Sequence, residues 1–123
     1  MAESFGYLRR LGIALALAAR PLLLMLDEPA AGLNAAEGAQ LAEVLRRIHQ
    51  RGVTLVVVDH DMDFLLPLVE RLVVLANGAK LREGPPAAIR SDPAVIEVYL
   101  GSIGTKVSDL TNVEGAGAEQ IRG

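Results

Sequence analysis

The chain has 123 residues, enough for one modest domain with a small hydrophobic core. Hydrophobic residues make up 51% of it and charged residues 22%, which excludes disorder for most of the length. Only 3% is aromatic, so the core must be aliphatic. The net charge of −3, without a block of Lys or Arg, does not favour nucleic acid as a main partner. The absence of cysteine excludes disulfides and thiolate metal sites.

The first predicted element is a helix over residues 7–19, which consists of strong helix formers and ends before Arg20-Pro21. Its second half is apolar on every side, so we expect it to be buried. The two arginines and the apolar run after them are also similar to a signal peptide or a membrane anchor. We expect neither, because Arg20-Pro21 divides the run into pieces shorter than the about 18 apolar residues that a span needs.

Two apolar runs with a helix between them predict a parallel pair of strands. Residues 22–26 form a continuous apolar run, which is typical of a strand covered on both faces, and residues 53–60 form a second, β-branched run that ends in polar residues. Between them, Asn34 and Glu37 have the spacing of a helix cap and capping box, an apolar stripe follows, and Gly52 ends the helix. The order of strand, helix and strand predicts a right-handed crossover and an α/β fold.

The remaining elements are shorter. Residues 61–71 are typical of a helix in which Pro67 introduces a kink or an early end. Asn77-Gly78, between apolar flanks, predicts a hairpin with a type I′ turn over residues 71–84. A closing helix follows, capped by Ser91 or Asp92. Periodicity is lost after residue 101, so we expect one ordered region over residues 1–101 and a flexible tail over residues 102–123.

Polar residues follow both predicted parallel strands. Asp27-Glu28 and Asp59-His60 lie at their carboxyl ends, where ligands bind in α/β sheets. One carboxylate there can hold Mg²⁺ through water, a second can activate a water molecule, and a histidine can contact a phosphate. The alternative is that the acids cap the following turn and that His60 caps the next helix.

The sequence around these residues resembles the ATP-binding cassette (ABC) ATPases. “LLLMLDEP” is similar to their Walker B segment, “AAGLN” to their D-loop and “VVVDHDM” to their switch-histidine loop. “ESFGYLRRLGIALALAARP” is similar to their signature motif and its helix, and the D-loop together with “GPPAAIRSDPAVIEVYLG” most resembles the branched-chain amino acid importer subfamily. The resemblance covers residues 3–101. It implies a partial P-loop NTPase fold, with a short parallel sheet, flanking helices and a C-terminal β-hairpin.

The resemblance implies a role for each matching residue at the ATP site. Asp27 would help to hold Mg²⁺ through water, Glu28 would be the general base for the hydrolytic water, and His60 would contact the γ-phosphate. Ser4 and Gly6 would cap the γ-phosphate of an ATP molecule that the opposite subunit holds. A hydroxyl, a glycine N–H and a helix N-terminus are all suited to bind one anion.

The same resemblance implies partners and a location. Gly32, Leu33 and Asn34 would carry contacts across an interface with a second ATPase subunit, in a homodimer or a heterodimer. The other expected partners are membrane permease subunits, and the expected location is the cytoplasmic face of the cell membrane. The expected cofactors of the full domain are ATP and Mg²⁺.

This sequence departs from the family pattern in two places. Glu3 stands where the family has leucine, and Tyr7 and Leu15 replace the usual glutamine and arginine. No Gly-x-x-x-x-Gly-Lys-Ser/Thr phosphate-binding loop, or P-loop, occurs in the 123 residues.

We therefore expect this chain to be the C-terminal portion of a subunit that energises branched-chain amino acid uptake, and to be inactive as an ATPase by itself. In that case some apolar strands and helix faces lack cover. The alternative is a non-catalytic α/β binding or regulatory module derived from an ABC ATPase.

Overall fold

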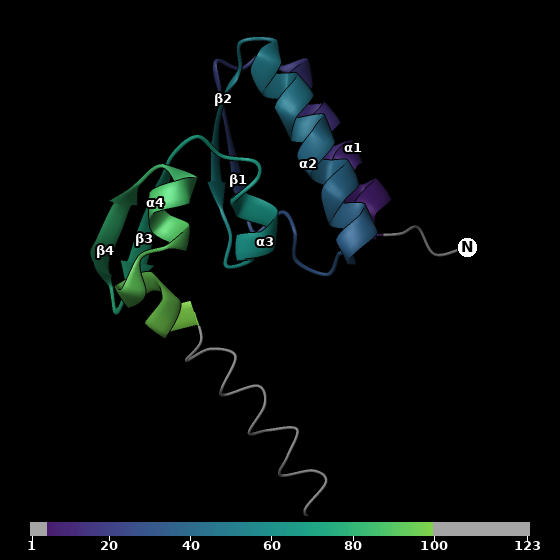
Figure 1. Ribbon diagram of the computed structural model, residues 1–123. Coiled ribbons are helices and arrows are strands. Elements are labelled where there is room, and N and C mark those ends of the chain that lie inside the picture. Colours follow the sequence, from purple (N-terminus) through teal and green to yellow (C-terminus); the bar gives the residue numbers. More distant parts are fainter. Residues whose placement is uncertain (1–4, 100–123) are drawn as a thin grey trace, which may run out of the picture. The chain divides into compact units, whose positions relative to one another are not determined.

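The structure is a computed structural model that describes residues 5–99 of the chain, with the side chains of residues 6–99 (Figure 1). The chain divides into two compact units, residues 1–69 and residues 70–123, and each is described by itself. Ser4, Glu3 and the predicted tail over residues 102–123 lie outside the described residues. Within residues 5–99, no helix combines the length and the apolar character that crossing a membrane requires.

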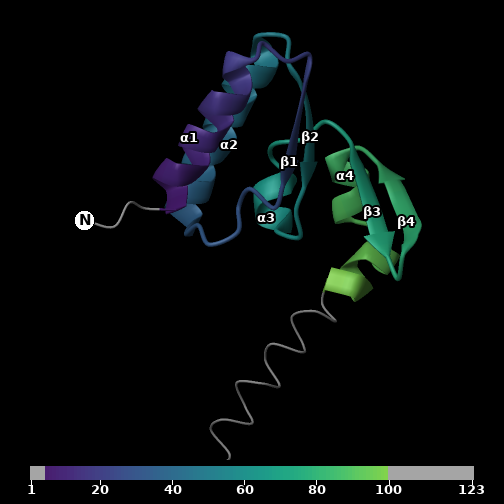
Figure 2. The ribbon, with the colours of Figure 1, turned by 180° about the vertical axis from the view of Figure 1, so that it is seen from behind.

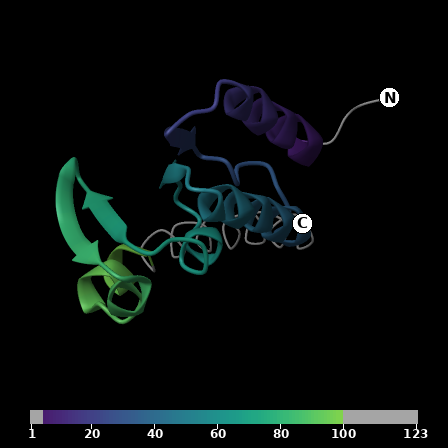
Figure 3. The same ribbon diagram turned by 90° about the horizontal axis from the view of Figure 1, so that it is seen from above.

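The first unit contains a parallel pair of strands with helices on one side. Its elements are α1 (Phe5–Ala18), β1 (Leu23–Asp27), α2 (Ala35–Gln50), β2 (Thr54–Val58) and α3 (Met62–Leu65). The strands β1 and β2 pair in parallel, with Leu24 opposite Leu55 and Asp27 opposite Val58, which confirms the predicted strand–helix–strand unit. Figures 2 and 3 show that α1 and α2 lie on the same side of the two strands.

The helix between the strands forms as its sequence predicts. The Asn34 side chain accepts a hydrogen bond of 2.8 Å from the Glu37 N–H and donates one of 2.9 Å to the Glu37 carboxylate. At the other end, Gly52 adopts a φ of 96°, which a residue with a side chain rarely adopts. The apolar stripe of the helix is buried and includes Leu45, which is 0% exposed.

The expectation that both faces of the strands are covered was wrong for the described chain. Leu24 is buried, but Leu23 on the opposite face is 47% exposed and Met25 is 69% exposed. The second half of α1 is also not buried, since Leu15 is 68% exposed while Ile13 is buried. The reason is that both helices lie on one side of a two-stranded sheet, so one face of the sheet and the outer side of α1 have no cover within the first unit. The expectation of uncovered apolar faces is confirmed.

The second unit is a hairpin followed by helices. The strands β3 (Leu72–Ala76) and β4 (Ala79–Gly84) pair antiparallel, and Asn77 and Gly78 have φ values of 52° and 75°, as a type I′ turn requires. The helix α4 (Pro86–Arg90) follows, and residues 93–99 are helical as well. The carboxylate of Asp92 accepts hydrogen bonds from the N–H groups of Ala94 and Val95, so Asp92 is the cap of this last helix.

Candidate functional site

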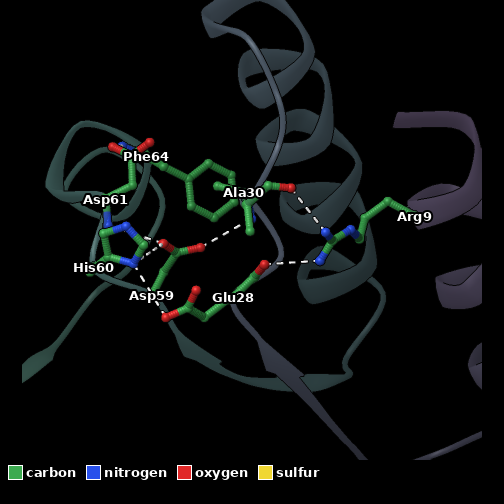
Figure 4. Close-up of polar contacts among 8 residues, drawn as sticks. Arg9, Glu28, Ala30, Asp59, His60, Asp61 and Phe64 are labelled. Atoms are coloured by element: carbon green, nitrogen blue, oxygen red, sulfur yellow. Dashed lines mark hydrogen bonds and ion pairs between the residues drawn. The ribbon is translucent and has the colours of Figure 1, made fainter. Parts of the chain in front are cut away.

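The carboxyl ends of β1 and β2 bring Glu28 and His60 together. The Glu28 N–H donates to the carbonyl of Val58 over 2.6 Å, which extends the pairing of the two strands by one residue. The Glu28 carboxylate lies 3.2 Å from Nδ1 of His60, and the two side chains point toward one another (Figure 4). Because an ionised carboxylate can only accept, Nδ1 of His60 is the donor. The two side chains are 50% and 74% exposed, so both are open to a ligand.

Glu28 has an unusual backbone conformation. Its φ is 47°, in the left-handed region that residues with side chains seldom occupy. It begins a turn over residues 28–31, in which the Ala31 N–H donates to the Glu28 carbonyl over 3.1 Å. The strand ends here because Pro29, which is fully buried, cannot donate a hydrogen bond to continue it. We refer to residues 28–31 below as the 28–31 turn.

A buried carboxylate lies beside this pair. The side chain of Asp59 is 1% exposed, and it accepts a hydrogen bond of 3.0 Å from the Ala30 N–H and one of 3.0 Å from the Asp61 N–H. Hydrogen bonds to both carboxylate oxygens satisfy a charge that would be costly to bury alone. Asp59 thereby joins the 28–31 turn to the segment that carries His60.

An arginine from α1 binds the same turn. The guanidinium of Arg9 donates to the carbonyls of Glu28 and Ala31, each over 2.9 Å (Figure 4). A planar guanidinium can bind two acceptors at once, which a lysine ammonium does less well. The 28–31 turn is therefore held from α1 and from the end of β2.

Asp27 ends β1 opposite Val58 and is exposed. Its carboxylate oxygens are ligands that Mg²⁺ accepts. Among residues 6–99, however, no group of three or more His, Cys, Asp or Glu side chains is arranged to hold a metal ion. The described residues therefore do not form a complete metal site by themselves, and Asp27 could supply one ligand or a contact through water.

The remaining predicted residues lie around the start of α2. A Cβ atom at Gly6 would come within 3.4 Å of the Glu37 carboxylate, and the same carboxylate accepts from Asn34. Gly32 has a φ of 77°, and the Leu33 N–H donates to the Ala30 carbonyl over 3.1 Å. The structure therefore connects Gly6 and Asn34 through Glu37, in addition to the pair of Glu28 and His60.

The structure also adds residues that sequence reasoning missed. The sequence placed Asp59 at a strand end beside His60 but assigned it no role, because its partners are backbone N–H groups, one of them 29 residues away. Arg9 had no signal in the sequence, because its contacts span 19 and 22 residues. The alternative in which His60 caps the next helix is wrong, since Asp61 accepts from the Phe64 N–H and caps α3. That helix covers only Met62–Leu65 of the predicted residues 61–71, so of the two alternatives at Pro67, a kink or an early end, the structure has the early end.

Comparison with known proteins relates both sequence and fold to one group. A family described as branched-chain amino acid ATP-binding cassette transporter matches residues 83–103. The high-affinity branched-chain amino acid transport ATP-binding protein BraF of Pseudomonas aeruginosa is 41% identical over 99 residues, which cover 80% of this chain and 39% of BraF. LivG of Escherichia coli, described in the same terms, is 39% identical over 99 residues, with 80% of this chain and 39% of LivG covered.

Solved structures give the same result. The ADP conformation of an ATP-binding cassette of an ABC transporter has a TM-score of 0.72 and 28% identity, covering 78% of this chain and 39% of that one. A nucleotide-free ATP-binding cassette has a TM-score of 0.73 and 27% identity, covering 79% of this chain and 40% of that one. The α/β fold with a short parallel sheet and an antiparallel hairpin is thus that of ABC ATPase domains. The chain spans 39% of the length of the curated relatives named above.

Proposed function

This chain belongs to the ABC ATPases, and from that premise we propose that the ends of β1 and β2 carry residues with which a transporter ATP-binding subunit hydrolyses ATP. The transported substrate class that we propose is branched-chain amino acids, as in the names of BraF and LivG. The observation that carries the proposal is the contact between the Glu28 carboxylate and Nδ1 of His60, which joins the ends of two parallel strands across 32 residues.

The proposed mechanism assigns each residue a task. Mg²⁺ and ATP supply the electrophilic phosphorus and the charge that the site stabilises. Glu28 accepts a proton from the attacking water, and its hydrogen bond with His60 orients the carboxylate. His60 would contact the γ-phosphate, and Asp27 would help to hold Mg²⁺ through water. The exposure of Glu28 and His60 supports these roles, because both groups are accessible to a nucleotide.

We also propose the partners that the family resemblance implies. Ser4 and Gly6 would bind the nucleotide of a second ATPase subunit, and Gly32, Leu33 and Asn34 would contact that subunit. Permease subunits would hold the assembly at the cytoplasmic face of the membrane. The exposure of Gly32 and Asn34, in the segment between the 28–31 turn and α2, supports this arrangement.

The first experiment measures the isolated chain. The 123 residues contain no P-loop, so the β- and γ-phosphates lack their lysine and backbone cradle. We expect negligible ATP hydrolysis and weak binding of Mg-ATP, measured by phosphate release and by calorimetry on the purified chain. Robust turnover that is lost in Glu28→Gln would contradict this expectation.

The second experiment adds a phosphate-binding loop from a relative. In a chimera, this chain replaces the 99-residue part of BraF with which it aligns, and the rest of BraF is kept. We expect ATP hydrolysis by this chimera, and Glu28→Gln to lower kcat by about 10²- to 10⁴-fold, the usual contribution of a general base. Glu43→Gln, which changes an exposed glutamate that pairs with Arg46 on α2, is the matched control. A folded, nucleotide-binding chimera that is indifferent to Glu28 and His60 substitutions would favour the non-catalytic module instead.

A further inference from the structure

The 28–31 turn, which carries the Glu28 carboxylate, needs support that its own sequence does not provide. Glu28 lies at a φ of 47°, a conformation that a residue with a side chain keeps only where its surroundings determine it. The turn has one internal hydrogen bond, from the Ala31 N–H to the Glu28 carbonyl. The direction of the Glu28 side chain depends on this backbone. Contacts that hold the turn therefore also determine where the carboxylate lies.

Two side chains from different elements bind the backbone of this turn. Arg9 of α1 donates to the carbonyls of Glu28 and Ala31, each over 2.9 Å. Asp59, beyond the end of β2, accepts from the N–H of Ala30 over 3.0 Å. Arg9 binds carbonyl oxygens of the turn and Asp59 binds an N–H group of the turn, so the two side chains do not compete for the same backbone groups. Figure 4 shows Arg9 and Asp59 approaching the turn from different sides.

Asp59 has a second contact that relates the turn to His60. Its other carboxylate oxygen accepts from the N–H of Asp61 over 3.0 Å and lies 3.9 Å from Nδ1 of His60. The side chain is 1% exposed, so this carboxylate is not placed to meet a ligand itself. A buried carboxylate with hydrogen bonds to two segments restricts the distance between them. Here one segment is the 28–31 turn with Glu28, and the other is the segment that carries His60.

We propose that Arg9 and Asp59 are positioning residues that hold the 28–31 turn and so set the contact between Glu28 and His60. The assignment of a task to that contact rests on the proposed function, but the positioning itself is a property of the chain without nucleotide. Arg9 acts through the carbonyls of the turn, and Asp59 acts through the N–H of Ala30.

The test is nuclear magnetic resonance on the full chain without nucleotide, in Arg9→Gln, Arg9→Lys and Asp59→Asn. Two signals are followed: hydrogen exchange of the Ala30 and Ala31 amides, and the ¹⁵N shift of Nδ1 of His60, which reports the hydrogen bond to Glu28. We expect Arg9→Gln to accelerate exchange of the Ala31 amide by about tenfold or more, because about tenfold corresponds to the loss of one hydrogen bond and Arg9 donates two to this turn. Asp59→Asn keeps one acceptor oxygen, so we expect about tenfold faster exchange at the Ala30 amide or at the Asp61 amide, whichever then faces the new NH₂ group. Both variants should move the His60 signal toward that of Glu28→Gln.

The controls separate positioning from general stability. Arg10→Gln changes the neighbouring arginine of α1, which donates to the Gly6 carbonyl over 3.4 Å, and Asp63→Asn changes an exposed acid of α3. Both should leave the His60 signal unchanged. Arg9→Lys keeps the charge but not the planar fork, so it should give an intermediate His60 shift. Exchange of the Leu45 amide in α2 reports global stability and should stay within twofold of the parent chain.

The proposal is overturned if the His60 signal in Arg9→Gln and Asp59→Asn matches the controls, or if it moves only in proportion to faster exchange at Leu45. Neither result depends on ATP. An inactive chimera would therefore contradict the proposed function and leave the positioning intact. An unmoved His60 signal would contradict the positioning and leave the chimera experiment intact.

Discussion

The two units of the chain use polar side chains differently. In the first unit the polar contacts at the strand ends are distant in sequence: Glu28 and His60 are 32 residues apart, and Asp59 and Ala30 are 29 apart. In the second unit the ion pairs are closer in sequence, from three residues apart for Lys80 and Glu83 to twelve for Arg71 and Glu83. The first set joins the ends of two parallel strands, and the second set lies within the hairpin and between the hairpin and the last helix.

Charged neighbours in the second unit lower the pKa values of two carboxyl groups. Hydrogen bonds from Lys80 and from Arg71 hold the pKa of Glu83 below its ordinary value. Burial alone would raise the pKa of Asp92, but hydrogen bonds from Arg82 and from the N–H groups of Ala94 and Val95 together lower it. We therefore expect acid to weaken the second unit through Glu83 and Asp92, and core substitutions to act on the unit that contains them.

The largest expected effect is a core substitution in the first unit. Leu45 is 0% exposed within α2, so Leu45→Ala leaves a cavity and should destabilise the first unit by about 2–5 kcal/mol. Amide exchange resolved by residue measures the loss, which should appear in residues 5–69. Leu75→Ala, at a position that is 68% exposed, is the matched control and should change stability by about 0.5 kcal/mol or less. An equal loss in the amides of β3 and β4 would show that the units are not independent.

A smaller effect is expected at the hairpin turn. Gly78 has a φ of 75° and open space where a Cβ would lie, so Gly78→Ala costs only the left-handed backbone conformation, about 1–2 kcal/mol. The loss should appear in exchange of the β3 and β4 amides. Gly12→Ala, in the middle of α1 and also with open space, should have the opposite sign and stabilise by about 0.5–1 kcal/mol. Equal signs for the two substitutions would contradict the assigned backbone conformations.

The smallest expected effect is the response to acid. Because the pKa values of Glu83 and Asp92 are lowered in the folded chain, their contribution to stability is complete above their unfolded values and is lost as the pH falls through the folded ones. Amide protection in the second unit should stay level from neutral pH to about pH 5 and decline below about pH 4. Arg82→Gln should flatten this decline, while Arg90→Gln in α4 should not.

The sequence predicted the order of the elements, since this order depends on local signals. The capping pair of Asn34 and Glu37, the turn at Asn77-Gly78 and the cap at Asp92 are each contained in a few residues, and each is confirmed. Burial was harder to predict. An apolar run shows that a residue can be buried but not that a neighbour exists to cover it, so Met25 and Leu15 are exposed. Arg9 could not be foreseen at all, because its partners are backbone carbonyls, which leave no mark in a sequence.

The parallel register of β1 and β2 has a consequence for how the chain folds. The hairpin of β3 and β4 joins its strands through a two-residue turn, and such hairpins form within about 1–10 μs. The strands β1 and β2 cannot meet until α2 has brought the chain back, which requires closing a long loop. We therefore expect the hairpin to be native while Glu28 and His60 are still apart, so the candidate site would be among the last parts of the molecule to assemble.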